Sequence, residues 1–179
     1  MIWVIGLGAS LGDRRRALRL GIAALAATPG LRVVALSRLW RSPPMGGVAR
    51  GAFLNAAVSV AWSGEPTALL ERTRAIERQL GRRAGPRWGD RPLDLDLLWA
   101  GDLVLDTPSL VLPHPGLFQR NFALVPLLEV AEKAWDPRTK TPLSALPAAS
   151  RVGLCPAGVL SLSLRSIDQR CIGEPFPPR

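Results

Sequence analysis

Two acidic residues stand two positions apart in an apolar stretch, and their spacing could hold a cation. In residues 93–98, Leu and Asp alternate up to position 97, so a strand here would carry Asp94 and Asp96 on one face. Their Cα atoms would lie roughly 6.6 Å apart, and two carboxylates this close repel each other unless a cation sits between them. Oxygen ligands of this kind suit Mg²⁺, which also shares substrate phosphates. The same pattern arises by chance in edge strands whose acidic residues face water, so the pair alone leaves both readings open.

Arginines precede the acidic pair in a segment that also contains glycine and proline. Arg82, Arg83, Arg87 and Arg91 all lie within residues 81–92. Their planar guanidinium groups match the geometry of phosphate oxygens. An acidic pair next to several arginines therefore indicates the chemistry of a metal-bound polyphosphate.

The composition narrows the class of protein. The chain has 179 residues, a formal net charge of +9, and Arg at every basic position except Lys133 and Lys140. A compositional bias toward Arg and an anionic ligand, either a nucleotide or a nucleic acid, both explain this charge. The two cysteines, Cys155 and Cys171, make no disulfide framework and favour a reducing compartment, so we expect a cytoplasmic protein. No apolar run approaches about 18 residues, so we expect no membrane span.

Apolar periodicity predicts alternating strands and helices in one domain, residues 1–147, followed by a tail, 148–179. The turn at 100–102 leads us to expect 103–105 as a hairpin partner of the acidic strand. In the tail, an alternating piece at 159–164 predicts an edge strand, and we expect disorder after it. The expected strands are 2–7, 33–40, 53–62 and 93–98, and the expected helices are 13–28, 66–80 and 121–130, the last capped by Asn121 with Pro126 near its first turns.

Two further sites carry residues suited to a small ligand. Phe53 and Asn55 would share one face of their strand, where an aromatic ring can stack on a flat heterocycle while the amide reads its edge. His114 stands between Pro113 and Pro115 and is therefore held in a rigid loop. Each signal is weak when taken alone, because Phe-x-Asn is common in strands and a loop His often bonds only to backbone.

Taken together, these segments resemble the 6-hydroxymethyl-7,8-dihydropterin pyrophosphokinases, a family of folate-pathway enzymes. The most specific segment is Arg-Trp-Gly-Asp-Arg-Pro-Leu-Asp-Leu-Asp at 87–96, joined by Pro-His-Pro at 113–115 and Arg-Asn-Phe at 120–122. The other matching segments are 8–14, 42–46, 53–58, 76–77 with 81–82, and 126–129, and the resemblance covers about residues 2–137.

The resemblance implies an α+β, ferredoxin-like fold, with a mostly antiparallel sheet covered by helices in a single domain. It implies transfer of diphosphate from ATP to the hydroxymethyl group of the reduced pterin, with release of AMP. It also implies two Mg²⁺ ions held by Asp94 and Asp96. By match to the family motifs, the catalytic residues would be Arg82, Arg91, Asp94 and Asp96, the ATP contacts Glu77, Trp88, Arg91, Leu97, His114 and Arg120, and the pterin contacts Pro43, Pro44, Met45, Phe53, Asn55 and Phe122.

Two other functions have to be weighed against this one. A basic nucleic-acid-binding module would use the arginines for phosphates and Phe53 or Trp88 for stacking, but the acidic pair would repel nucleic acid. A two-metal nuclease or nucleotidyltransferase usually needs a third carboxylate near the pair, and Glu77 is the one candidate in the sequence. We therefore expect ATP and a reduced pterin as partners, with no nucleic acid or membrane, and a monomer.

Overall fold

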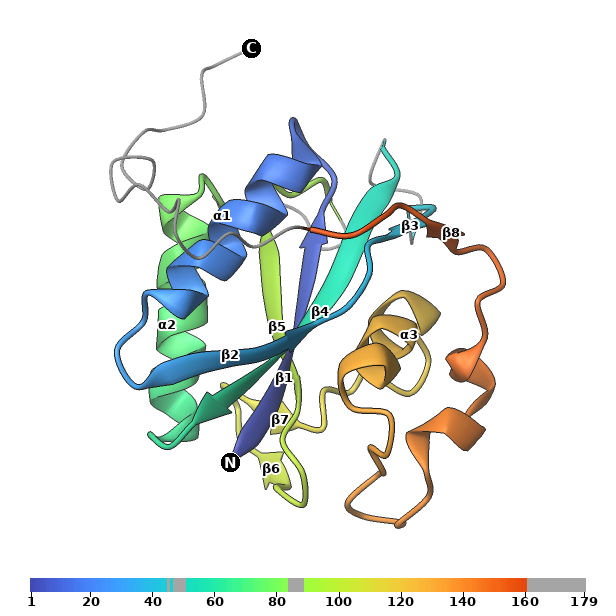
Figure 1. Ribbon diagram of the computed structural model, residues 1–179. Coiled ribbons are helices and arrows are strands. Elements are labelled where there is room, and N and C mark those ends of the chain that lie inside the picture. Colours follow the sequence, from blue (N-terminus) through green and yellow to red (C-terminus); the bar gives the residue numbers. More distant parts are fainter. Residues whose placement is uncertain (45, 47–50, 84–88, 161–179) are drawn as a thin grey trace.

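A sheet of six strands, all paired antiparallel, lies at the centre of the part of the chain that the structure describes (Figure 1). The structure is a computed structural model, and it describes residues 1–44, 46, 51–83 and 89–160. The strand order is β5-β1-β4-β3-β8, and β2 pairs with β4 beside β3. The strands are β1 (Ile2–Ala9), β2 (Leu31–Leu36), β3 (Trp40–Ser42), β4 (Phe53–Trp62), β5 (Asp94–Trp99) and β8 (Cys155–Pro156).

The chain passes through the sheet in the order expected of a ferredoxin-like fold. Helix α1 (Arg14–Ala26) follows β1, and helix α2 (Pro66–Gln79) connects β4 to β5. These two helices pack together on one face of the sheet, and α3 (Asn121–Val130) covers part of the opposite face (Figure 1). The α+β fold with a mostly antiparallel sheet is thus confirmed.

The period-2 pattern of β1 decides which side chains face each helical layer. Trp3, Ile5 and Leu7 are buried in the core beneath α1 and α2, and Val4 is buried in the second core beneath α3. Asp13 caps α1, because its carboxylate accepts a hydrogen bond from Arg16 N at 2.9 Å. The two cores together fix the sheet between its helices.

The strand expected at 33–40 is wrong as a single element, because the structure divides it into β2 and β3. Ser37 lies in the break, and its hydroxyl accepts the N–H of Ala57 at 2.8 Å in place of a backbone carbonyl. A serine side chain that bonds to backbone in this way interrupts a strand ladder. Beyond the break, Leu39 exchanges backbone hydrogen bonds with the C-terminal segment: Ala157 N donates to Leu39 O at 2.8 Å, and Leu39 N donates to Gly158 O at 2.7 Å.

The hairpin partner expected at 103–105 is also placed differently. β6 (Leu105–Asp106) pairs with β7 (Val111–Leu112) and not with β5. The Thr107 side chain closes this small hairpin, because its Oγ1 accepts from Leu110 N and donates to Leu110 O. A local side-chain contact therefore determines the pairing.

The beginning of α3 differs from the sequence prediction as well. Arg120 is the N-cap residue and Asn121 is the first helical residue, so Asn121 does not cap the helix. Its amide instead donates to Val152 O at 2.7 Å. Pro126 lies inside the helix near its first turns, as expected, and it is buried.

The described part of the tail, residues 148–160, packs against the domain. Its strand is β8 at Cys155–Pro156, whereas the expected edge strand at 159–164 extends into residues 161–164, which lie outside the described residues. Two 3-10 helices, Leu143–Ala145 and Pro147–Ala149, precede it. The boundary after residue 147 and the disorder of the last residues remain predictions. Throughout the described ranges, each helix is too short or too polar to cross a bilayer.

Candidate functional site

The acidic pair lies on the face of the sheet that α3 leaves partly open. Asp94 and Asp96 both point from β5 into a cavity, while Leu93, Leu95 and Leu97 on the other side of the chain are buried in the main core. Asp94 accepts hydrogen bonds from Arg82 at 2.5 Å and from Arg91 at 3.1 Å. These two arginines come from opposite ends of the segment that precedes β5.

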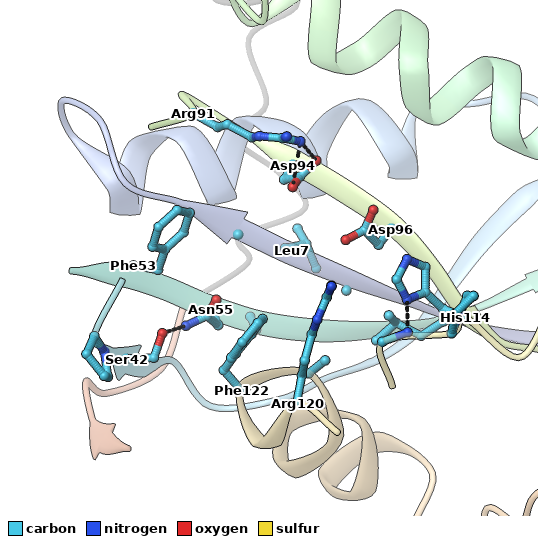
Figure 2. Close-up of a pocket in the computed structure, with 18 of the residues that line it drawn as sticks. Leu7, Ser42, Phe53, Asn55, Arg91, Asp94, Asp96, His114, Arg120 and Phe122 are labelled. Carbon is cyan, nitrogen blue, oxygen red and sulfur yellow. Dashed lines mark hydrogen bonds and ion pairs between the residues drawn. The ribbon is translucent and has the colours of Figure 1, made fainter. Parts of the chain in front are cut away.

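Asp96 is the less compensated carboxylate of the two. Burial, followed by the neighbouring charge of Asp94, raises the pKa of Asp96 to about 7. Arg82, Arg120 and Arg91 oppose this rise, and Arg120 extends from the start of α3 toward the carboxylates (Figure 2). The site thus gathers positive charge around the pair without giving Asp96 an ordinary pKa.

Arg91 is held in place by its own backbone. Its N–H donates to Ser10 Oγ at 2.9 Å, and its carbonyl accepts from Ser10 N at 2.9 Å. Ser10 belongs to the glycine-rich turn after β1, and this turn therefore fixes the position of Arg91 beside Asp94.

Glu77 reaches the acidic strand from α2. The residue is 4% exposed, and its carboxylate accepts from Leu95 N at 2.7 Å and pairs with Arg82. Burial raises the pKa of Glu77 to about 7, although the hydrogen bond from Leu95 and the charge of Arg82 oppose the rise. Glu77 therefore ties α2 to β5 and fixes Arg82, which in turn holds Asp94.

An amide between two aromatic rings forms the far end of the cavity. Asn55 is 4% exposed, and its Nδ2 donates to Trp40 O at 3.2 Å and to Ser42 Oγ at 3.0 Å. Its oxygen therefore faces the cavity, between the rings of Phe53 from β4 and Phe122 from α3 (Figure 2). An acceptor flanked by two rings suits a flat ligand that carries N–H donors at its edge.

Gly8 forms the floor between the amide and the carboxylates. A Cβ at this position would lie 3.7 Å from Asn55 Oδ1 and 3.9 Å from Asp94 Cβ. A larger side chain would thus fill the space that separates the two ends of the cavity.

His114 occupies the third side of the cavity. The Leu112–Pro113 peptide bond before it is cis, and His114 N donates to Leu98 O at 2.9 Å. Burial lowers the pKa of His114, so the ring is neutral at pH 7. Its Nδ1 accepts from Gly116 N at 3.0 Å, so the proton of the neutral ring lies on Nε2 and is available to a ligand.

Two cavities meet at this site. The first has a volume of about 370 Å³ and contains the aromatic rings, Asn55 and both carboxylates. The second, of about 860 Å³, runs between α2 and the β6–β7 hairpin and is lined by several arginines. Asp96, His114 and Pro115 line both cavities and therefore mark the place where two ligands would meet.

Most of the residues singled out in the sequence line one of these cavities. Pro44 is exposed and does not line the first one, and Met45 and Trp88 lie outside the described residues. In the first cavity lie Pro43, Phe53, Asn55, Arg91, Asp94, Asp96, His114, Arg120 and Phe122; in the second lie Glu77, Arg82, Asp96, Leu97 and His114.

Sequence reasoning missed two groups of residues. Arg74 and Arg78 lie one turn apart on α2 and line the second cavity with Arg82 and Arg83. Their spacing of four could have indicated a basic helix face. Ser42, which holds the Asn55 amide, gave no signal beyond its place before two prolines.

Comparison with known proteins identifies the family. The family model described as 7,8-dihydro-6-hydroxymethylpterin-pyrophosphokinase (HPPK) matches residues 4–132. The chain belongs to this family. All the residues that line the two cavities lie within the matched range.

Three bacterial relatives are named 2-amino-4-hydroxy-6-hydroxymethyldihydropteridine pyrophosphokinase. The protein of Methylorubrum extorquens is 44% identical over 127 residues, which cover 71% of this chain and 80% of the relative. That of Bacillus subtilis is 38% identical over 129 residues, covering 72% and 77%. That of Synechocystis sp. is 39% identical over 136 residues, covering 76% and 69%.

Proposed function

We propose that this HPPK-family chain transfers the β,γ-diphosphate of ATP to the hydroxymethyl group of 6-hydroxymethyl-7,8-dihydropterin and releases AMP, a step in folate biosynthesis. One observation carries the proposal: an aromatic cavity with an amide and an arginine-lined cavity meet at a pair of carboxylates. A flat acceptor in the first cavity would present its hydroxyl to a polyphosphate in the second. The family membership and the names of the relatives support the same reaction.

The pterin would lie between Phe53 and Phe122, with its edge against Asn55. The Asn55 amide is already committed to Trp40 O and Ser42 Oγ, so the free group is an oxygen, which accepts hydrogen bonds. The relatives are named for a 2-amino-substituted pteridine, and a 2-amino group is an N–H donor of the kind that this oxygen can accept from. Pro43 would close the same end, and Pro44 and Met45 are proposed here only from the family motif.

ATP would occupy the arginine-lined cavity, with its phosphates directed toward Asp96 and His114. Arg82 and the neighbouring arginines match phosphate geometry, and the Nε2–H of His114 adds a neutral donor. Glu77 and Leu97 line the same cavity, whereas the role of Trp88 rests on the motif alone. Arg91 and Arg120 would bind phosphate oxygens from the side of the first cavity.

The donor set at the junction suits Mg²⁺. Asp94 and Asp96 supply two adjacent carboxylates, and hard oxygen ligands of this kind are those that Mg²⁺ takes in proteins. Within the described ranges no third acidic, His or Cys side chain joins them, so phosphate oxygens and water would complete the coordination. We propose two ions. When bound, Mg²⁺ would neutralise phosphate charge and polarise the phosphorus under attack.

The protein's own contribution is positioning and charge stabilisation. Asn55 and the two rings would orient the acceptor, and the His114 loop would place a donor beside the transferred group. Arg82 and Arg91 would then stabilise charge that develops on the phosphate oxygens, an effect that reaches several kcal/mol in a site shielded from water. We further propose that the enzyme acts in the cytoplasm, in line with its free, exposed Cys155, and that it is a monomer.

The nucleotide product tests this proposal. Purified protein with ATP, Mg²⁺ and the reduced hydroxymethylpterin should form AMP, and AMP formation should need both the pterin and the metal. Chromatography of the nucleotides separates AMP from ADP. Formation of ADP, or AMP formation that does not depend on the pterin, would contradict diphosphate transfer.

A further inference from the structure

The segment 151–158 lies beyond the family-matched residues, yet it is attached to a wall of the first cavity. Its strand β8 pairs with β3, placing Cys155 opposite Arg41 and Pro156 opposite Trp40. The hydrogen bonds between Leu39 and residues 157 and 158 extend this pairing by one more residue. We call residues 151–158 the C-terminal brace.

Side chains join the brace to α3 as well as to β3. Leu154 is 8% exposed and forms a small apolar cluster with Trp40 from β3 and Val125 from α3. Phe122, a wall of the first cavity, packs against this cluster. The guanidinium of Arg151 lies 5.3 Å from the Trp40 ring, which adds a cation–π contact.

β3 transmits these contacts to the amide at the end of the cavity. This strand has only three residues, and it is held by β4 on one side and by β8 on the other. Its Trp40 carbonyl and Ser42 hydroxyl are the two acceptors that orient Asn55. A three-residue strand that loses one of its neighbours loses much of what fixes it, and the Asn55 amide would lose its fixed acceptors at the same time.

We propose that the C-terminal brace positions Asn55 and Phe122 and thereby sets the affinity of the first cavity for its flat acceptor. Leu154 is the central positioning residue, because it contacts both elements that carry the cavity's walls. The proposal rests on the proposed function in taking that acceptor to be the pterin. It assigns the brace no contact with the arginine-lined cavity, so the binding of ATP should not depend on it.

Kinetics of the full-length protein test the proposal. Leu154→Ala should raise the KM for the pterin by about 10-fold, because it removes the side chain that packs against both β3 and α3; tenfold corresponds to about 1.4 kcal/mol of binding free energy. The KM for ATP and kcat should stay within about twofold. Leu154→Met should restore most of the wild-type KM, since Met refills the space. Val152→Ala is the matched control, because Val152 is an aliphatic residue of the same segment that is 81% exposed, and its KM values should not change.

Hydrogen exchange of the wild-type protein gives a second measurement that needs no variant. The amides of Leu39 and Ala157 donate the bonds that join β3 to the brace. Adding the pterin to protein saturated with Mg²⁺ and a non-hydrolysable ATP analogue should slow exchange at both amides, because the coupling between two sites is reciprocal. The analogue and Mg²⁺ alone should leave them unchanged.

The outcomes separate the two proposals. If the wild-type protein forms no AMP that depends on the pterin, both the brace proposal and the proposed function are wrong. Wild-type activity with an unchanged pterin KM in Leu154→Ala would overturn the brace alone. The brace proposal is also wrong if the activity of Leu154→Ala falls only in proportion to its folded fraction. It is likewise wrong if adding the pterin does not change hydrogen exchange at Leu39 and Ala157.

Discussion

Replacing Asp96 with Asn should stabilise the protein at pH 8 when EDTA removes metal ions. The pKa of Asp96 is raised from 3.8 to about 7, by burial first and by Asp94 second. A carboxyl group whose pKa is higher in the folded protein than in the unfolded chain binds more protons when folded. Stability therefore falls as the pH rises from about 4 to about 7, and the penalty is fully present above that window. The Asn side chain carries no charge and therefore does not incur this penalty.

The size of the gain follows from the same shift. Three pH units correspond to an upper limit of about 4 kcal/mol. The Asn amide keeps a burial cost of its own, about 1–3 kcal/mol, so the expected gain is at most about 1–3 kcal/mol. For a chain of this length, each kcal/mol corresponds to about 2–4 °C in Tm.

Thermal unfolding followed by circular dichroism, in EDTA from pH 5 to pH 8, measures the difference. Glu77 also has its pKa raised to about 7 and titrates in both proteins, so the gap between the two curves reports Asp96 together with its interaction with the neighbouring carboxylates. The gap should be largest at pH 8 and shrink toward pH 5. Asp94→Asn is the control, because Asp94 is paired with Arg82 and Arg91 and its loss should lower Tm.

Ligand addition completes the test. Mg²⁺ with a non-hydrolysable ATP analogue at 100 times its Kd should stabilise the wild type by about 2.7 kcal/mol, and Asp96→Asn much less. If Asp96→Asn melts clearly below the wild type in EDTA at pH 8, Asp96 is a structural carboxylate and the reasoning is refuted. The metal role is likewise refuted if the variant keeps the full ligand-induced shift.

Two further substitutions examine the walls of the first cavity. Arg91→Ala should lower kcat by about 100-fold, while Tm changes by only a few degrees because Asp94 keeps its ion pair with Arg82. An activity loss that merely follows a large drop in Tm would contradict this. Gly8→Val should weaken pterin binding by at least about 10-fold, because the valine methyl groups would enter the space between Asn55 and Asp94. Calorimetry with Mg²⁺ and the ATP analogue present measures this affinity. An unchanged affinity would show that the pterin does not lie over Gly8.

The sequence predicted the sheet faces well because strand periodicity is local. The alternation in residues 93–98 and 53–62 was enough to place Asp94 with Asp96 and Phe53 with Asn55 on the cavity side. The family motifs then pointed to Arg82, Arg120 and Phe122, which lie far apart in the chain.

Features that depend on contacts between distant segments could not be predicted in this way. The break in the strand at Ser37 arises from a hydrogen bond to Ala57, and neither residue signals it in the sequence. The pairing of β8 with β3 joins residues more than a hundred positions apart, through a segment that contains glycine and proline and has no clear period. The second cavity likewise exists only because α2 packs opposite the β6–β7 hairpin.

The hydrogen bond from Leu95 to Glu77 has a consequence for the behaviour of the protein in concentrated solution. β5 is the edge strand on its side of the sheet. An unpaired backbone N–H on an edge strand, such as that of Leu95, can pair with a strand from another molecule. The Glu77 carboxylate occupies that donor at 2.7 Å, and helix α2, which carries Glu77, packs beside β5. Glu77, which forms an ion pair with Arg82, therefore also blocks one backbone donor through which β5 could pair with another molecule.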